Sequence, residues 1–143
     1  MPLPTGLLGA IQEVFANTNL IVQIPGNIWT GLAPDQTTMP FVVIPSLRLT
    51  NDPGYEGCVA DTGDVEFVCV AVGAVAAEAI AMIIKNTYGP KASWETMRIQ
   101  DQIVEEFSYL GYTVELTKEY LNEAGNPVYK GTVTFHAVVN STV

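Results

Sequence analysis

Basic residues, histidine and cysteine are all scarce in this chain, and each scarcity argues against a class of function. Of 143 residues, six are Lys or Arg, one is His and two are Cys. Tight nucleic-acid binding needs clustered Lys and Arg, whereas the six basic residues here are scattered singly. One His and two separated Cys cannot supply a zinc site, and two Cys do not make a disulfide scaffold.

Charge of either sign is also sparse. Charged residues make up 15% of the chain, against about 25% in an average domain. The fifteen Asp and Glu residues dominate and give a formal net charge of −9. A surface so short of charge fits contacts with other chains, although a surface rich in Thr, Asn and Gln would look the same. The acidity fits either a surface that repels DNA or one that simply keeps the protein soluble.

Catalytic patterns are missing as well. His136 falls on the polar side of the last expected strand, and no nucleophile motif such as G-x-S-x-G accompanies it. The acidic stretch Asp61-Thr62-Gly63-Asp64 lacks the spacing of a calcium loop. No Gly-Lys-Ser/Thr sequence of a phosphate-binding loop is present. We therefore expect no enzyme, no metal and no cofactor.

The apolar stretches are those of a core. Hydrophobic residues make up 48% of the chain, and a chain of this length can bury a core without a disulfide. Cys69 lies among Val and Ala and is expected inside that core, while Cys58 lies in a Gly-rich loop as a free thiol. The longest apolar run, residues 68–84, contains Gly73 and Glu78 and fits a strand followed by a helix. We expect neither a membrane span nor a signal peptide.

Helical periodicity occurs in two segments. In residues 4–17 the apolar side chains recur on one stripe, and Thr5 stands where it can cap a helix. Residues 74–88 repeat the pattern with many Ala, and Gly89-Pro90 follows as a stop signal. The pattern predicts one helix in each segment.

Strand patterns fill much of the rest. A short strand is expected at 28–32 and a longer one at 41–49, where the internal Pro45 indicates an edge position or a bulge. Residues 64–72 become apolar on both faces, as in a central strand. Between these two strands, residues 50–63 predict a long polar loop, and loops of that length are often functional.

The chain closes on a predicted hairpin. Gly125-Asn126 supplies the turn chemistry between two alternating segments. Residues 94–106 leave two alternatives open, a strand or a short helix from Ser93. On the first hairpin strand the apolar face is expected to consist of Leu110, Tyr112, Val114 and Leu116, and on the second of Tyr129, Val133, Phe135, Ala137 and Val139.

These elements together predict one α+β domain spanning residues 1–143. It should contain a mostly antiparallel β-sheet, two helices packed on one face and a closing C-terminal β-hairpin.

Two stretches of the sequence resemble a known family. One runs from Ala33-Pro34 to Met39-Pro40-Phe41-Val42-Val43, and the other is the acidic turn with Tyr129-Lys130-Gly131 in the final hairpin. With the order of elements from residue 7 to residue 139, they are similar to the tail-terminator proteins of tailed bacteriophages. The chain departs from many of those proteins in its extended stretch over residues 103–120.

The resemblance implies a structural role. It implies a hexameric ring that caps the head-proximal end of the tail tube, ends tube polymerisation and joins the tail to the neck. The implied partners are other copies of the chain, the tail tube protein and neck or adaptor proteins, with DNA only passing through the lumen. The protein would be made in the host bacterial cytoplasm and reside in the virion at the tail–neck junction. The alternatives are a head-completion or neck protein on the portal side and a small ligand-binding or enzymatic α+β domain.

A closed ring of identical subunits needs two different patches on each subunit. The polar loop and the hairpin tip can reach a neighbour, and the candidate interface residues there are Tyr55, Glu56, Asn122, Glu123 and Asn126. Three acids could line a channel and repel DNA phosphate, unless they are ordinary surface acids: Asp61, Asp64 and Glu66.

Overall fold

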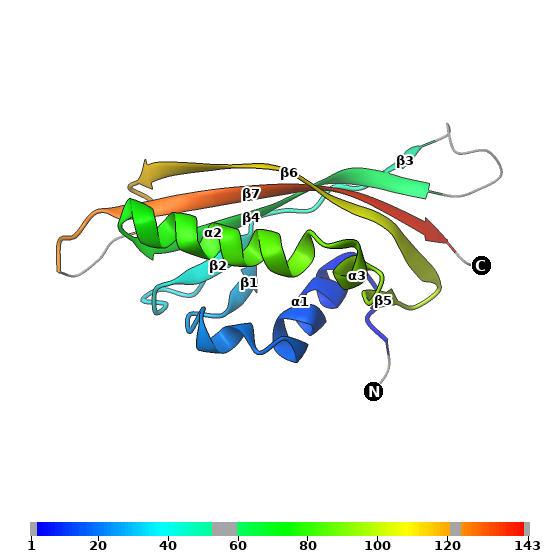
Figure 1. Ribbon diagram of the computed structural model, residues 1–143, viewed down its shortest axis with the longest axis horizontal. Helices are drawn as coiled ribbons and strands as arrows, with labels where there is room; N and C mark the ends of the chain where they lie inside the picture. The colour runs from blue at the N-terminus through cyan, green and yellow to red at the C-terminus, as the bar shows by residue number, and fades with distance from the viewer. Residues whose placement is uncertain (1–2, 53–59, 121–123, 142–143) are drawn as a thin grey trace.

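The fold is a single curved sheet with its helices gathered on one side, as the computed structural model of residues 3–52, 60–120 and 124–141 shows (Figure 1). The strand order is β1-β2-β4-β7-β6-β5, and β3 pairs with β4 outside this path. In chain order the elements are α1 (Leu7–Asn17), the 3₁₀ turn η1 (Leu20–Val22), β1 (Ile28–Thr30), β2 (Phe41–Ile44), β3 (Thr50–Asp52), β4 (Ala60–Val72), α2 (Ala74–Tyr88), α3 (Lys91–Trp94), β5 (Arg98–Ile99), β6 (Gln102–Thr117) and β7 (Val128–Ser141).

Three long antiparallel strands form the centre of the sheet. Strand β7 pairs along its length with β4 on one side and with β6 on the other. Among the strands of the described residues, only β1 and β2 run parallel. The register of β6 shifts twice, between Val104 and Glu106 and between Tyr109 and Gly111. The predicted α+β class, the mostly antiparallel sheet and the closing hairpin are confirmed.

The core lies between the sheet and the helices α1 and α2. Four rings at its centre are buried, and Phe107 stacks on Phe135 with 4.8 Å between ring centroids. Phe67 lies 4.9 Å from Tyr88 and 5.4 Å from Phe135. The Tyr88 hydroxyl donates a hydrogen bond of 2.7 Å to the Ile11 carbonyl, which ties α2 to α1. Both helices therefore pack on the same face, as predicted.

The second helix begins and ends where its pattern predicts, at Ala74 and Tyr88. The first begins later, at Leu7, and its N-cap is Gly6 with no side-chain hydrogen bond, so the predicted Thr5 cap is wrong. The Pro4 carbonyl instead accepts a hydrogen bond of 2.8 Å from the Gln100 amide. This bond fastens the segment before α1 to the β5–β6 turn and keeps it out of the helix.

Two predicted boundaries in the first half of the sheet are wrong. Strand β2 ends at Ile44, so Pro45 lies outside it, and β2 is an interior strand between β1 and β4. Residues 50–63 are not all loop, because β3 pairs with β4 over three residues and β4 already begins at Ala60. The polar residues there are exposed or only partly buried, and a run of polar residues is equally typical of a loop. The rest of the predicted loop, 53–59, lies outside the described residues.

The ambiguous stretch contains both alternatives. A short helix is present, but α3 spans Lys91–Trp94 and therefore begins before Ser93, the predicted first residue. A strand follows it, and β5 consists of Arg98 and Ile99 before β6 begins at Gln102. The first hairpin strand is therefore longer than the pattern from Leu110 onward predicts.

Candidate interaction surfaces

The face of the sheet that turns away from α1 and α2 is called the open face here. Residues paired across antiparallel strands point to the same side, and Val65, Phe67 and Cys69 of β4 belong to the helix-side core. The alternate residues of β4 therefore point to the open face. By register the open face carries four acids of the central strands, Asp64, Glu66, Glu106 and Glu115, together with Lys130 and His136.

Both basic side chains of these central strands contact carboxylates. Lys130 Nζ lies 3.7 Å from Glu115 Oε1. His136 Nδ1 lies 3.0 Å from Asp64 Oδ1, and its Nε2 lies 3.8 Å from Glu106 Oε2. The basic groups are thus engaged within the sheet, and the open face presents a surplus of negative charge.

The predicted lumen acids do not share one face. Asp64 and Glu66 point to the open face, whereas Asp61 pairs with Val139, a residue of the helix-side core. Glu106 and Glu115 also lie on the open face, although neither is among the three acids predicted to line a channel. Glu106 follows a register shift of β6, which interrupts the simple alternation that would place it. Glu115 lies between Val114 and Leu116, where the alternation correctly predicts that it faces the opposite side.

The predicted interface residues are described only in part. Tyr55, Glu56, Asn122 and Glu123 lie outside the described residues. Asn126 is exposed in the connection that precedes β7. Its position at the end of the hairpin agrees with the expected tip, and no contact to another copy tests its role.

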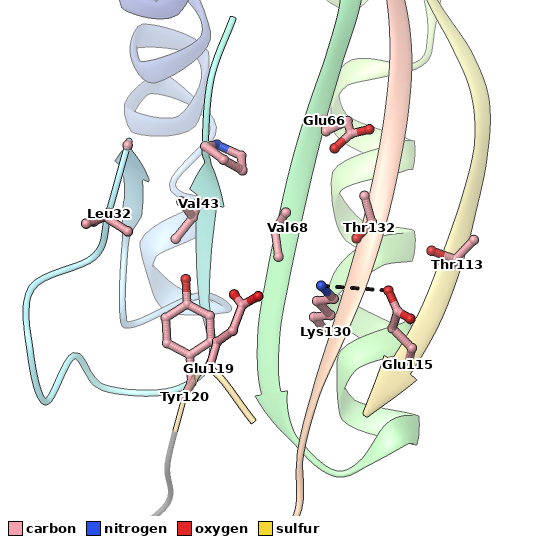
Figure 2. A pocket seen from close by; sticks show the side chains of 12 residues that line it. Leu32, Val43, Glu66, Val68, Thr113, Glu115, Glu119, Tyr120, Lys130 and Thr132 are labelled. Atoms are coloured by element: carbon pink, nitrogen blue, oxygen red, sulfur yellow. Dashed lines mark ion pairs between the residues drawn. The ribbon is translucent and has the colours of Figure 1, made fainter. Parts of the chain in front are cut away.

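A hollow opens on the open face beside β2. Figure 2 looks into it, with Leu32, Val43 and Tyr120 on one side and Thr113, Glu115 and Lys130 on the other. Its volume is about 480 Å³, and a larger one of about 1020 Å³ adjoins it through Leu32, Glu119 and Tyr120. We call the larger one the β1 groove; its lining includes Leu32, Pro34, Asp35, Met39, Phe41, Glu119 and Tyr120.

Tyr120 shapes both hollows because it crosses from the hairpin to the start of β2. Its ring meets Phe41 edge-on at 5.2 Å. Partial burial, and then the neighbouring Glu119 carboxylate, raise the pKa of the Tyr120 hydroxyl. The segment after β6 is thereby packed on a second apolar cluster that includes Phe41, Val43, Val70 and Val128.

The opposite margin of the sheet carries an exposed apolar surface on the helix side. We call it the β6–α2 strip; it consists of Val75, Tyr112 and Leu116, together with Leu110 in the neighbouring register shift of β6. Tyr112 donates a hydrogen bond of 3.0 Å to Glu78 Oε2, and Lys85 Nζ lies 4.7 Å from the centroid of the Tyr109 ring. The hydrogen bond to Glu78, and then its negative charge, raise the pKa of Tyr112.

The strip contains most of the apolar face that is predicted for the first hairpin strand. Tyr112, Val114 and Leu116 lie on the side of α2, as the alternation predicts. However, Tyr112 and Leu116 are exposed, because α2 packs mainly on β4 and β7. Leu110 falls in the second register shift and is also exposed. Beyond its pairing with β5 at Gln102 and Ile103, the outer edge of β6 has no strand partner among the described residues.

The described residues offer little to chemistry. They include no group of three His, Cys, Asp or Glu side chains placed to hold a metal ion. His136 contacts two carboxylates, and Cys69 is buried, which raises the pKa of its thiol and suppresses the reactive thiolate. In the same residues, every helix is too short or too polar to cross a membrane.

Comparison with known proteins yields a match of fold. No protein-family model and no curated protein matches the chain. Among solved structures, it is similar to a chain in "Virion of native gene transfer agent (GTA) particle", with a TM-score of 0.69 and 12% sequence identity. The similarity covers 95% of this chain and 98% of that chain. The two chains therefore share a fold over almost their entire length.

Proposed function

We propose that this protein is a structural component of a phage-like particle and performs no catalysis. Specifically, it forms a hexameric ring that caps the head-proximal end of the tail tube, ends tube polymerisation and joins the tail to the neck. The observation that carries the proposal is the fold shared with a virion chain over 95% of this chain and 98% of that one. The tail-terminator resemblance of the Ala33 to Val43 stretch and of the final hairpin supports the specific role.

The charge of the open face supports its position in such a ring. A channel for DNA must not bind phosphate, and a wall of negative charge repels it. Asp64, Glu66 and Glu106 supply that charge, while His136 is held between two of these carboxylates. In the proposed ring the open face lines the lumen, and the helices lie outside.

Tube growth tests the proposed role directly. Purified tail tube protein would be polymerised with and without this protein, and tube lengths would be measured by electron microscopy. We expect the protein to sit at one tube end and to stop growth there. If it leaves the tubes unchanged and binds the portal or adaptor protein instead, it is a neck protein. A monomer that binds neither partner contradicts both roles.

The lumen assignment has its own test with a matched control. Particles with Asp64→Lys and Glu106→Lys should release DNA more slowly, because two positive charges per copy would line the channel. Asp61→Lys adds one positive charge on the opposite face and should release DNA like the wild type. Equal release rates for all three particles would contradict the inward position of the open face.

A further inference from the structure

We infer that neighbouring copies join by a lap joint, in which the β6–α2 strip of one copy packs into the β1 groove of the next. This inference rests on the proposed ring and specifies its subunit contact. A closed ring uses heterologous contacts, so each copy must present two different, complementary surfaces. The strip and the groove satisfy this requirement in chemistry, in position and in charge.

The strip is the main group of exposed apolar side chains, and the groove contains one of the most exposed. Of the nine large hydrophobic residues exposed in the described part of the chain, four form the β6–α2 strip and one, Leu32, lines the β1 groove. Val75 is 84% exposed, and Leu32, which lines the groove, is 83% exposed. Scattered single residues need no explanation, but apolar groups gathered in patches indicate contact surfaces.

The strip and the groove lie at opposite margins of the sheet. Strand β6 runs along the upper margin in Figure 1, while β1, α1 and the turn after it lie on the lower side. They also lie on opposite faces, since Tyr112 points toward α2 and Phe41 belongs to the open-face cluster. Two neighbouring copies can therefore overlap at their margins, with the helix side of the β6 margin of one copy covering the open face at the β1 margin of the next.

The two surfaces also lie at the same level along the strands. Leu116 pairs with Tyr129, which pairs with Ala71. Phe41 in the groove pairs with Val70, the residue next to Ala71. A neighbouring copy therefore needs only a sideways displacement, without sliding along the strands, to bring its strip onto the groove.

The charges agree with this placement. Glu66 lies at the border of the hollow that adjoins the groove, one residue along β4 from Val65. Val65 and Tyr109 both pair with Phe135, and Lys85 lies over the Tyr109 ring. The displacement that seats the strip thus brings Lys85 to the level of Glu66.

A mixing experiment tests the joint. Leu32→Asp disables the groove and Leu116→Asp disables the strip, and both side chains are exposed enough for the fold to tolerate the change. Native mass spectrometry should show rings for the wild type and monomers for each variant. An equal mixture should give dimers of twice the monomer mass, because each pair retains one intact groove and one intact strip. Leu3→Asp, an exposed apolar residue outside both surfaces, is the control and should form rings.

Charge reversal sharpens the result. Lys85→Glu should shift the assembly toward monomers, and combining it with Glu66→Lys should restore rings. Circular dichroism of each variant shows whether it is folded, so that lost assembly is not mistaken for lost structure.

Failure of the joint and failure of the proposed function give different results. Rings from either Asp variant, or a mixture that stays monomeric, would overturn the lap joint while leaving the capping role intact. A wild type that stays monomeric at hundreds of micromolar also overturns a joint that closes in solution. Only the tube-capping experiment decides the proposed function.

Discussion

The two faces of the central sheet are built from the same three strands but differ in almost every physical property. On the helix side, Phe67, Phe107 and Phe135 are fully buried against α2. On the open side, the alternate positions of the same strands carry Asp64 and Thr134, which are accessible to solvent. At these positions the helix side stabilises the fold and the open side is available for contacts with partners, although β4 and β7 also bury Val70 and Val128 on the open side.

This difference follows from the period of two along a strand. Neighbouring residues point to opposite faces, so Thr134 and Phe135 lie next to each other in sequence and in different environments. Burying an aromatic side chain removes apolar surface from water and contributes a few kcal/mol. Charged and hydroxyl side chains on the open face keep their hydration and contribute little to folding. Substitutions on the two faces should consequently separate stability from function.

The largest difference is expected between Phe135→Ala and Thr134→Ala. Phe135 is fully buried and contacts Phe107 and Phe67, so its truncation leaves a cavity. The free energy of unfolding of the Phe135→Ala variant should be lower than that of the wild type by about 3–5 kcal/mol. Thr134→Ala, on the open face, should cost about 1 kcal/mol or less. Urea denaturation measures both, and similar losses for the two variants would contradict the assignment of the faces.

A close approach between helix and sheet should give the next effect. A side chain at Gly131 would place its Cβ 2.9 Å from the Ala77 carbonyl oxygen and 3.3 Å from the Ala81 Cβ. Gly131→Ala therefore forces α2 away from β7 and should cost about 1–3 kcal/mol. Gly125→Ala is the control for a Gly with no atom nearby, although its φ of 76° carries its own backbone strain. A Gly131→Ala variant as stable as the wild type would contradict the contact.

The helix-side half of the sheet is also the half that sequence patterns predict well. The buried face of α2 and the apolar face of β7 follow directly from periodicity, because each continuous apolar stripe must face the hydrophobic core. The open face is harder to predict. A register shift next to Glu106 interrupts the alternation, so Glu106 cannot be assigned to a face from spacing alone, whereas the face of Glu115 follows from its place between Val114 and Leu116. The β1 groove depends on Tyr120 reaching Phe41, a contact between segments nearly eighty residues apart that no local pattern contains.

A smaller effect is expected at Tyr88, where the core is tied to α1. Tyr88→Phe removes the hydrogen bond to the Ile11 carbonyl and should cost about 0.5–1.5 kcal/mol at neutral pH. Burial raises the pKa of the Tyr88 hydroxyl, so the folded state holds this proton more tightly than the unfolded state does. Its contribution is therefore complete below about pH 10 and is lost as pH rises beyond that value.

The pH dependence distinguishes the buried hydroxyl from a general loss of packing. Between about pH 10 and pH 11, where unfolded Tyr ionises, the wild type should lose stability faster than Tyr88→Phe does. Tyr129→Phe is a control, because that Tyr lies on the same sheet but is only half-buried. Parallel alkaline curves for the wild type and Tyr88→Phe would contradict the buried, protonated hydroxyl.

The smallest effect is expected for the ion pair on the open face. The Lys130–Glu115 pair is 3.7 Å long, and the Glu115 side chain is 61% exposed. Exposed pairs contribute about 0–1 kcal/mol and are screened by salt, so Glu115→Gln should hardly change the unfolding free energy. It does free the Lys130 ammonium on a face that otherwise repels polyanions. At low salt the variant should therefore bind double-stranded DNA more tightly than the wild type, whereas Glu95→Gln, which frees Lys91 of α3 at the surface, should do so less. If Glu115→Gln instead unfolds the protein without changing DNA binding, the open face is a structural surface like the helix side, and the contrast between the two faces does not hold.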